Sequence, residues 1–172
     1  MGGMLCATNG GPARSRTIRR MADDHATLRE QVLAAARERG ILPADETVAA
    51  AAVGDLLIGS GMLDNRRTSD PDQVGYGGMI GEAAHAEGRY VIVATDRRVW
   101  DLLTRRHHLH HELDDRPGAA TSTGLGERMA AWYPAEGEHA GVLELGDRRF
   151  LVAAGEGDGA AAIADAVQRA RG

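Results

Sequence analysis

Two short apolar runs joined by a turn near the C-terminus constrain the fold of this chain more than any other feature. His139–Leu145 and Arg148–Ala153 are rich in aliphatic residues, and the Gly146-Asp147 pair between them suits a tight turn. This pattern predicts an antiparallel β-hairpin. A fold in which neighbouring strands run antiparallel is therefore expected.

A second hairpin is predicted in the middle of the chain. Arg89–Thr95 contains Tyr90–Val93, where aromatic and β-branched residues that favour strands stand together. A turn at Thr95–Arg97 then leads into Arg98–Leu103, which is again largely apolar. The two segments are expected to pair as neighbours.

The region before this hairpin is expected to contain further strands and one long loop. Glu46–Val53 and Leu56–Ile58 are apolar runs interrupted by Gly54. We expect strands there because the alanines carry no helical period, with a helix as the alternative for the Ala-rich part. Leu63–Gly78 is polar and rich in turn residues, which predicts a loop, and Met79–Ala86 is another candidate strand.

An amphipathic helix is predicted over residues 24–39. Asp23 or Asp24 suits its first turn, because a side-chain oxygen can cap the free backbone N–H groups and a negative charge suits the helix dipole. Gly40 comes just after the last turn and Pro43 shortly beyond it, which is typical of a helix end.

A second amphipathic helix is predicted at the C-terminus. Asp158 is its expected N-cap, and Ile163, Val167 and Ala170 recur on one face. The overlapping stretch Gly155–Gly159 is interpreted as a flexible link rather than a phosphate cradle, because its acidic residues repel phosphate.

A meander of antiparallel strands that ends in an amphipathic helix resembles the pleckstrin-homology (PH) superfold, in which that helix plugs one end of a bent seven-stranded barrel. Tyr90–Val99 is similar to the strand, Thr-Asp-x-Arg turn and strand of bacterial PH-like and GRAM-like domains. Arg149–Val152, with the acidic Gly-rich link and helix that follow, is similar to the end of such domains. The resemblance covers under half of the chain. It implies an α+β fold: a small bent antiparallel β-barrel or sheet with a C-terminal capping helix, to which this chain adds an N-terminal helix.

These expectations divide the chain into three parts. Residues 1–20 are expected to be a disordered basic extension, 21–42 an N-terminal helix, and 43–172 the PH-like domain. Four arginines and no acidic residue occur in the first part: Arg14, Arg16, Arg19 and Arg20. An organellar transit peptide is the alternative for this composition, and Met21 is a candidate start of the protein.

Composition argues against several classes of protein. The formal net charge of -5 argues against a dedicated nucleic-acid binder, which normally carries a net basic field. Cys6 is the only cysteine, which excludes an intramolecular disulfide and favours a reducing compartment. No apolar run approaches the roughly 20 residues of a transmembrane helix, and the start lacks the apolar core of a secretory signal. A cytoplasmic protein is expected.

A basic patch is the first candidate binding site. Arg97, Arg98, Arg105 and Arg106 flank the second predicted strand of the central hairpin and suit phosphate or carboxylate groups. The alternative is that they lie on different faces and only keep the sheet soluble. The resemblance implies that anionic lipid head groups can bind at the open end of the barrel, but the lipid-binding basic motif of the family is not reproduced. A protein partner is therefore the safer expectation.

Four histidines directly after these arginines are the second candidate site. On a strand two of them face each side, and on a helix the first and last come together, so neither geometry completes a zinc site alone. Glu82, His85, Asp114 or His139 would have to complete it through the fold. A solvated edge strand and a pH-responsive surface for an acidic partner are the alternatives. The four candidate ligands are His107, His108, His110 and His111.

Catalysis is not expected. The chain has no Gly-x-Ser-x-Gly, dinucleotide or P-loop motif, and no histidine is placed to activate a nucleophile locally. The resulting hypothesis is a non-enzymatic PH-like binding or adaptor module, without a cofactor, that recognises a protein or an anionic ligand. The alternatives are a metal-binding protein organised by the histidines and a structural subunit that forms homo-oligomers.

Overall fold

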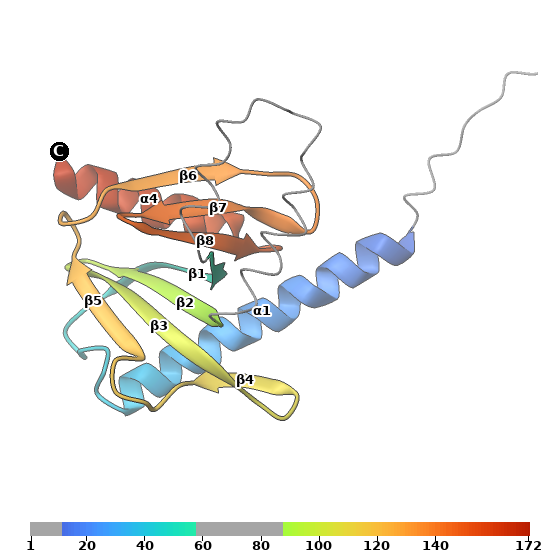
Figure 1. Cartoon of the computed structure of the whole chain (residues 1–172), viewed down its shortest axis with the longest axis horizontal. Coiled ribbons are helices and arrows are strands. Elements are labelled where there is room, and N and C mark those ends of the chain that lie inside the picture. Colours follow the sequence, from blue (N-terminus) through green and yellow to red (C-terminus); the bar gives the residue numbers. More distant parts are fainter. Residues whose placement is uncertain (1–11, 58–87) are drawn as a thin grey trace, which may run out of the picture.

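Eight strands form one antiparallel sheet between two helices in the part of the chain that the computed structural model describes, residues 12–57 and 88–172 (Figure 1). The expected α+β class, with an antiparallel sheet and a helix on either side of it in sequence, is confirmed. The elements are α1 (Pro12–Glu38), β1 (Val48–Leu56), β2 (Arg89–Thr95), β3 (Arg98–His107), β4 (His110–Leu113), β5 (Ala120–Gly124), β6 (Ala130–Pro134), β7 (His139–Leu145), β8 (Arg148–Ala153) and α4 (Gly157–Arg171).

The strands follow the order β4-β3-β2-β1-β8-β7-β6, and β5 also pairs with β3. β4 pairs with Thr104–His107 in the second half of β3, whereas β5 pairs with Arg98–Leu102 in the first half. Both predicted hairpins, β2–β3 and β7–β8, are confirmed. Across the described residues β5 and β6 do not pair, so the sheet is open there. The predicted loop Leu63–Gly78 and strand Met79–Ala86 lie outside these residues.

Most of β1 and β2, together with residues 99–104 of β3, is buried, because α1 and α4 lie on opposite faces of the sheet (Figure 1). Along β2, Val91 and Val93 pack with the apolar stripe of α1. The alternate residues, including Ile92, pack with the apolar face of α4 and with Phe150 of β8. The residues on both faces of β2 must therefore be apolar. This explains why apolar residues follow one another along β2 without interruption.

The Ala-rich segment is strand β1, as expected rather than the alternative helix. Ala50 and Ala52 face α4, where Ala160 and Ala164 belong to the same core. Small side chains on both elements bring the helix axis close to the sheet. At the closest point Gly159 of α4 lies against the backbone of Ala51.

Helix α1 ends as predicted but begins twelve residues before the predicted start. It begins at Pro12, so residues 12–20, expected to be disordered, are helical. Proline is well tolerated at the first position of a helix, and no glycine or second proline interrupts the arginine- and alanine-rich turns that follow. Asp23 and Asp24 therefore lie inside the helix and do not cap it. Gly40, with φ 70°, follows the last turn. Neither described helix is both long and apolar enough to cross a membrane.

The expected N-cap of the C-terminal helix is wrong. The cap position is Glu156, whose side chain makes no capping hydrogen bond, and Asp158 lies in the first turn. The Glu156 carboxylate is almost fully buried and accepts hydrogen bonds from Arg29 of α1, at 2.6 and 2.7 Å, and from the Val53 N–H of β1, at 3.1 Å. One carboxylate thus joins both helices to the sheet.

Replacing Glu156 with alanine is expected to lower the free energy of unfolding by about 2 kcal/mol, because the Val53 N–H loses its acceptor and Arg29 loses its partner. Arg29 is 28% exposed, so water limits the cost. Urea denaturation followed by circular dichroism measures the change. Glu144→Ala is the matched control, since Glu144 and Arg149 form an ion pair with both side chains about one-third exposed. Equal losses in the two variants would contradict the structural role of Glu156.

Candidate functional site

The four predicted arginines do not form one patch. Arg97 lies in the turn before β3 and Arg98 is its first residue, whereas Arg105 and Arg106 lie near its end. Arg98 and Arg105 are about 23 Å apart at the usual rise of a strand. Three of the four have acidic partners. Arg97 contacts Asp45 at 2.7 Å, Arg98 contacts Glu46 at 3.3 Å, and Arg105 contacts Glu112 at 2.9 Å and Asp115 at 3.3 Å.

The ion pairs of Arg97 and Arg98 give the basic turn between β2 and β3 a structural role. Glu46 is almost fully buried and accepts hydrogen bonds from Thr95, at 2.9 Å, and from the Trp100 indole, at 3.1 Å. Arg98 adds a charge to the same carboxylate. The hydrogen bond from Arg97 lowers the pKa of Asp45 below its usual range. The Thr95–Arg98 turn therefore anchors the segment before β1 to the β2–β3 hairpin.

The four histidines form a hairpin tip instead of a continuous strand. His107 of β3 pairs with His110 of β4, and His108 lies in the turn between them with a φ of 56°. The rings of His107 and His108 are 4.5 Å apart, and His107 Nδ1 lies 3.8 Å from Glu112. The alternation of faces expected for a strand is therefore wrong at His108.

The histidines do not converge on a metal site in the described structure. Across residues 12–57 and 88–172, no three side chains of His, Cys, Asp or Glu are grouped to hold one metal ion. Two of the side chains suggested to complete such a site, Glu82 and His85, lie outside these residues.

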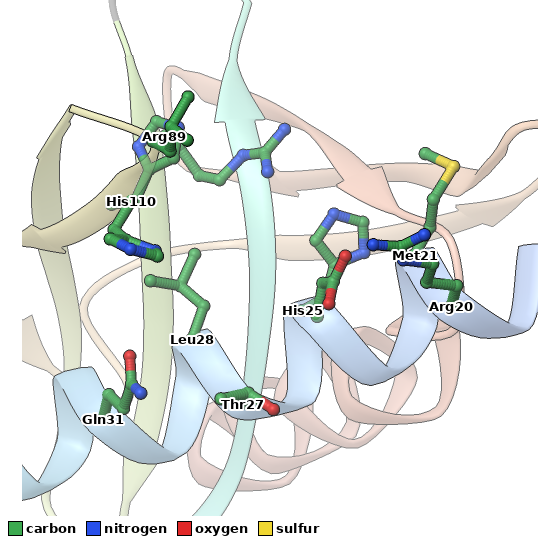
Figure 2. A pocket seen from close by; sticks show the side chains of 11 residues that line it. Arg20, Met21, His25, Thr27, Leu28, Gln31, Arg89 and His110 are labelled. Carbon is green, nitrogen blue, oxygen red and sulfur yellow. The ribbon is translucent and has the colours of Figure 1, made fainter. Parts of the chain in front are cut away.

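A cleft of about 680 Å³ lies between α1 and the β3–β4 hairpin (Figure 2). We call it the helix–hairpin cleft. Its lining comes from three separate parts of the chain: one flank of α1, the start of β2, and the hairpin tip. The lining residues are Arg20, Met21, Asp24, His25, Thr27, Leu28, Gln31, Arg89, Leu109, His110 and His111.

Polar contacts with neighbouring residues hold Arg89, His25 and His111 in place at the cleft. Arg89 Nε donates to Asp55 at 3.1 Å, which holds the guanidinium at the start of β2. His25 Nδ1 lies 3.2 Å from the Ala154 carbonyl oxygen. His111 Nδ1 lies 3.3 Å from the Thr104 hydroxyl. Figure 2 shows His25 on α1 beside Arg20 and Met21, with His110 on the other side of Leu28.

Two of these imidazoles have perturbed acidity. Burial lowers the pKa of His25, and repulsion from Arg89 adds to this, although the hydrogen bond to Ala154 opposes it. Burial likewise lowers the pKa of His111, again with a contribution from Arg89. The same guanidinium therefore acts on histidines from two different elements.

Among the predicted site residues, only His110 and His111 line the cleft. Arg20, His25 and Arg89 were not predicted as site residues, because they come from segments far apart in the sequence. One signal for His25 was present. It lies three residues before Leu28 and seven before Val32, so the apolar stripe of α1 carries an imidazole at that point.

Comparison of the sequence with protein-family models and with curated proteins, and of the structure with solved structures, finds no match.

Proposed function

We propose that this chain is a non-enzymatic binding module with a PH-like fold, and that it holds an anionic group of a protein or other ligand in the helix–hairpin cleft. The observation that carries the proposal is the lining of that cleft. Arg20, Arg89 and three imidazoles meet there around a volume within the range of ligand pockets. Guanidinium and imidazolium groups bind oxyanions through charge-assisted hydrogen bonds.

The strand order supports the PH-like part of the proposal. Without β4, seven antiparallel strands remain in the linear order β5-β3-β2-β1-β8-β7-β6, followed in sequence by helix α4. That is the number of strands and the position of the helix implied by the resemblance. β4 then extends the end of β3, and α1 is an addition that forms one wall of the cleft.

Sulfate is a suitable probe for the proposed site. In the full-length protein at about pH 6, sulfate added at constant ionic strength is expected to shift the backbone NMR signals of Arg89, His110 and His111 in a saturable manner. The double variant Arg20→Gln/His110→Gln is expected to bind sulfate about tenfold more weakly, because each removed group loses a charge-assisted hydrogen bond. Both side chains are exposed, so the fold should tolerate the changes.

Arg19→Gln is the matched control. Arg19 is an exposed neighbour on the same helix but does not line the cleft. Unchanged sulfate binding in this variant, together with weaker binding in the double variant, supports the site. Shifts that grow without saturation, or that respond equally to both sets of substitutions, would overturn the proposal.

A further inference from the structure

We propose that the helix–hairpin cleft binds a doubly charged, phosphate-like group, and that it takes up protons on His25 and His111 when it does so. This inference rests on the proposed function, because it specifies the ligand chemistry and the regulation of the same cleft.

The permanent charges of the cleft lining and of Asp55, the ion-pair partner of Arg89, cancel. Two arginines line it, Arg20 and Arg89. Two carboxylates oppose them: Asp24 also lines the cleft, and Asp55 is mostly buried at 3.1 Å from Arg89. With neutral imidazoles the site therefore has little net attraction for an anion. The histidines decide whether the cleft is cationic.

His25 can gain a proton at one ring nitrogen. Its Nδ1 donates to the carbonyl oxygen of Ala154, which leaves Nε2 as the nitrogen that gains the proton. The charged groups around it are Arg89 and Asp55 from the sheet and Glu156 at the start of α4. Glu156 is already paired with Arg29 at 2.6 Å, so its negative charge does little to stabilise a protonated His25.

His111 is in a similar position on the opposite wall. Thr104 contacts its Nδ1, while the charged groups near it are Arg89, Asp55 and Arg106. Arg89 disfavours the protonated form of both rings. His110 also lines the cleft and adds a third imidazole.

An anion bound in the cleft favours the protonated form of His25 and His111. Burial and Arg89 lower the pKa of His25 and of His111 in the free protein, which favours the neutral form of both rings near pH 7. A bound oxyanion attracts protons to them and offsets the repulsion from Arg89. Because the coupling is reciprocal, added protons must strengthen anion binding by the same free energy. Binding is therefore strongest at acidic pH and weakens as the imidazoles lose their protons.

The charge formed in this way favours a dianion over a monoanion. Protonation of His25 and His111 adds two positive charges to a site whose permanent charges cancel. A phosphate monoester or sulfate group matches two charges and has three or four oxygens, so it can accept several charge-assisted hydrogen bonds. A single carboxylate matches only one charge.

Sulfate and acetate separate these possibilities, because the charge of each is constant from about pH 5.5 to about pH 8 and only the protein titrates. With the full-length protein, sulfate is expected to bind at least tenfold more tightly at the acidic end, and acetate more weakly than sulfate throughout.

In a parallel arm, vesicles of phosphatidylcholine with phosphatidic acid test a lipid source. O-phosphoserine tests a soluble source. Both arms are run at one pH, because these phosphate groups themselves titrate at about pH 6. Saturable binding that sulfate competes away supports the inference, and the arm that shows it identifies the source.

Ring nitrogen NMR signals test the proton uptake without any substitution. Sulfate is expected to raise the pKa of His25 and of His111, whereas His139, exposed on β7, serves as the unaffected control. His111→Gln should then reduce the pH dependence of sulfate binding. Sulfate binding that is saturable but equal at all pH values, or no tighter than acetate binding, overturns this inference and leaves the proposed function standing. Absence of saturable binding at every pH overturns both.

Discussion

Replacing Asp101 with alanine is expected to lower the free energy of unfolding by about 3 to 5 kcal/mol. Asp101 lies in the middle of β3 with no exposed surface, and its carboxylate contacts Arg128 at 3.0 and 3.1 Å and Arg148 at 2.6 Å. Arg148 also lies over the rings of Tyr90 and Phe150. Removing the carboxylate leaves two guanidinium groups facing each other beside the apolar core. Urea denaturation measures the loss.

Asp115→Ala is the matched control for this prediction. Asp115 also pairs with an arginine, Arg105, at 3.3 Å, but its side chain is 63% exposed. Its removal is expected to change stability by about 0.5 kcal/mol or less. A further variant that combines Asp101→Leu with Arg128→Met and Arg148→Met should recover most of the loss, because no unpaired buried charge remains. A loss for Asp101→Ala no larger than that of the control would contradict the role assigned to the buried carboxylate.

The parts of the fold that were predictable are those specified by residues close together in sequence. The β7–β8 hairpin has a Gly146-Asp147 turn between two apolar runs, and the β2–β3 hairpin has a polar turn at Thr95–Arg98. Strands β5 and β6 were not predicted, and β4 was covered only by the edge-strand alternative for the histidine segment. They are short, only partly buried and lack a strong apolar alternation, so their pairing with β3 and β7 depends on the rest of the sheet.

The ends of the helices show where local rules give way to tertiary contacts. Asp23 has the side chain of an N-cap but lies inside α1, because the preceding residues continue the helix. Asp158 was the expected cap of α4, whereas the cap position is occupied by Glu156. The Glu156 carboxylate accepts hydrogen bonds from the Arg29 guanidinium and the Val53 N–H instead of capping the helix. Both partners are more than 100 residues away in sequence.

The candidate site was predictable only in part for the same reason. His110 and His111 stood out as a histidine cluster, but their relation to His25 depends on how α1 crosses the sheet. The basic turn at Arg97 and Arg98 is predicted as a binding feature because positive charge is visible in a sequence. The acidic partners that neutralise it, Asp45 and Glu46, come from the segment before β1.

Replacing Gly159 with alanine is expected to destabilise the protein by on the order of 3 kcal/mol, the reverse of the usual effect in a helix. Alanine in place of glycine inside a helix normally adds about 0.5 to 1 kcal/mol of stability. At Gly159, however, a Cβ would overlap the carbonyl oxygen of Ala51 and lie 3.5 Å from the Cβ of Ala52. The obstacle is strand backbone, which cannot rotate away as a side chain can. Helix α4 must therefore move off β1, opening the core that Ile163 and Val167 fill.

Gly157→Ala separates this steric effect from helix propensity. Gly157 is the first residue of the same helix, and an added Cβ there would meet the side chains of Ala140, at 3.3 Å, and Trp132, at 3.6 Å. Those groups can yield by small shifts, so we expect a stability change of about 1 kcal/mol or less. Thermal unfolding gives the ranking, and the amide NMR signal of Ala51 should shift only in Gly159→Ala. If Gly159→Ala proves as stable as the unmodified protein, the close approach of α4 to β1 is wrong. The small size of the alanines in β1 would then have another cause than contact with α4.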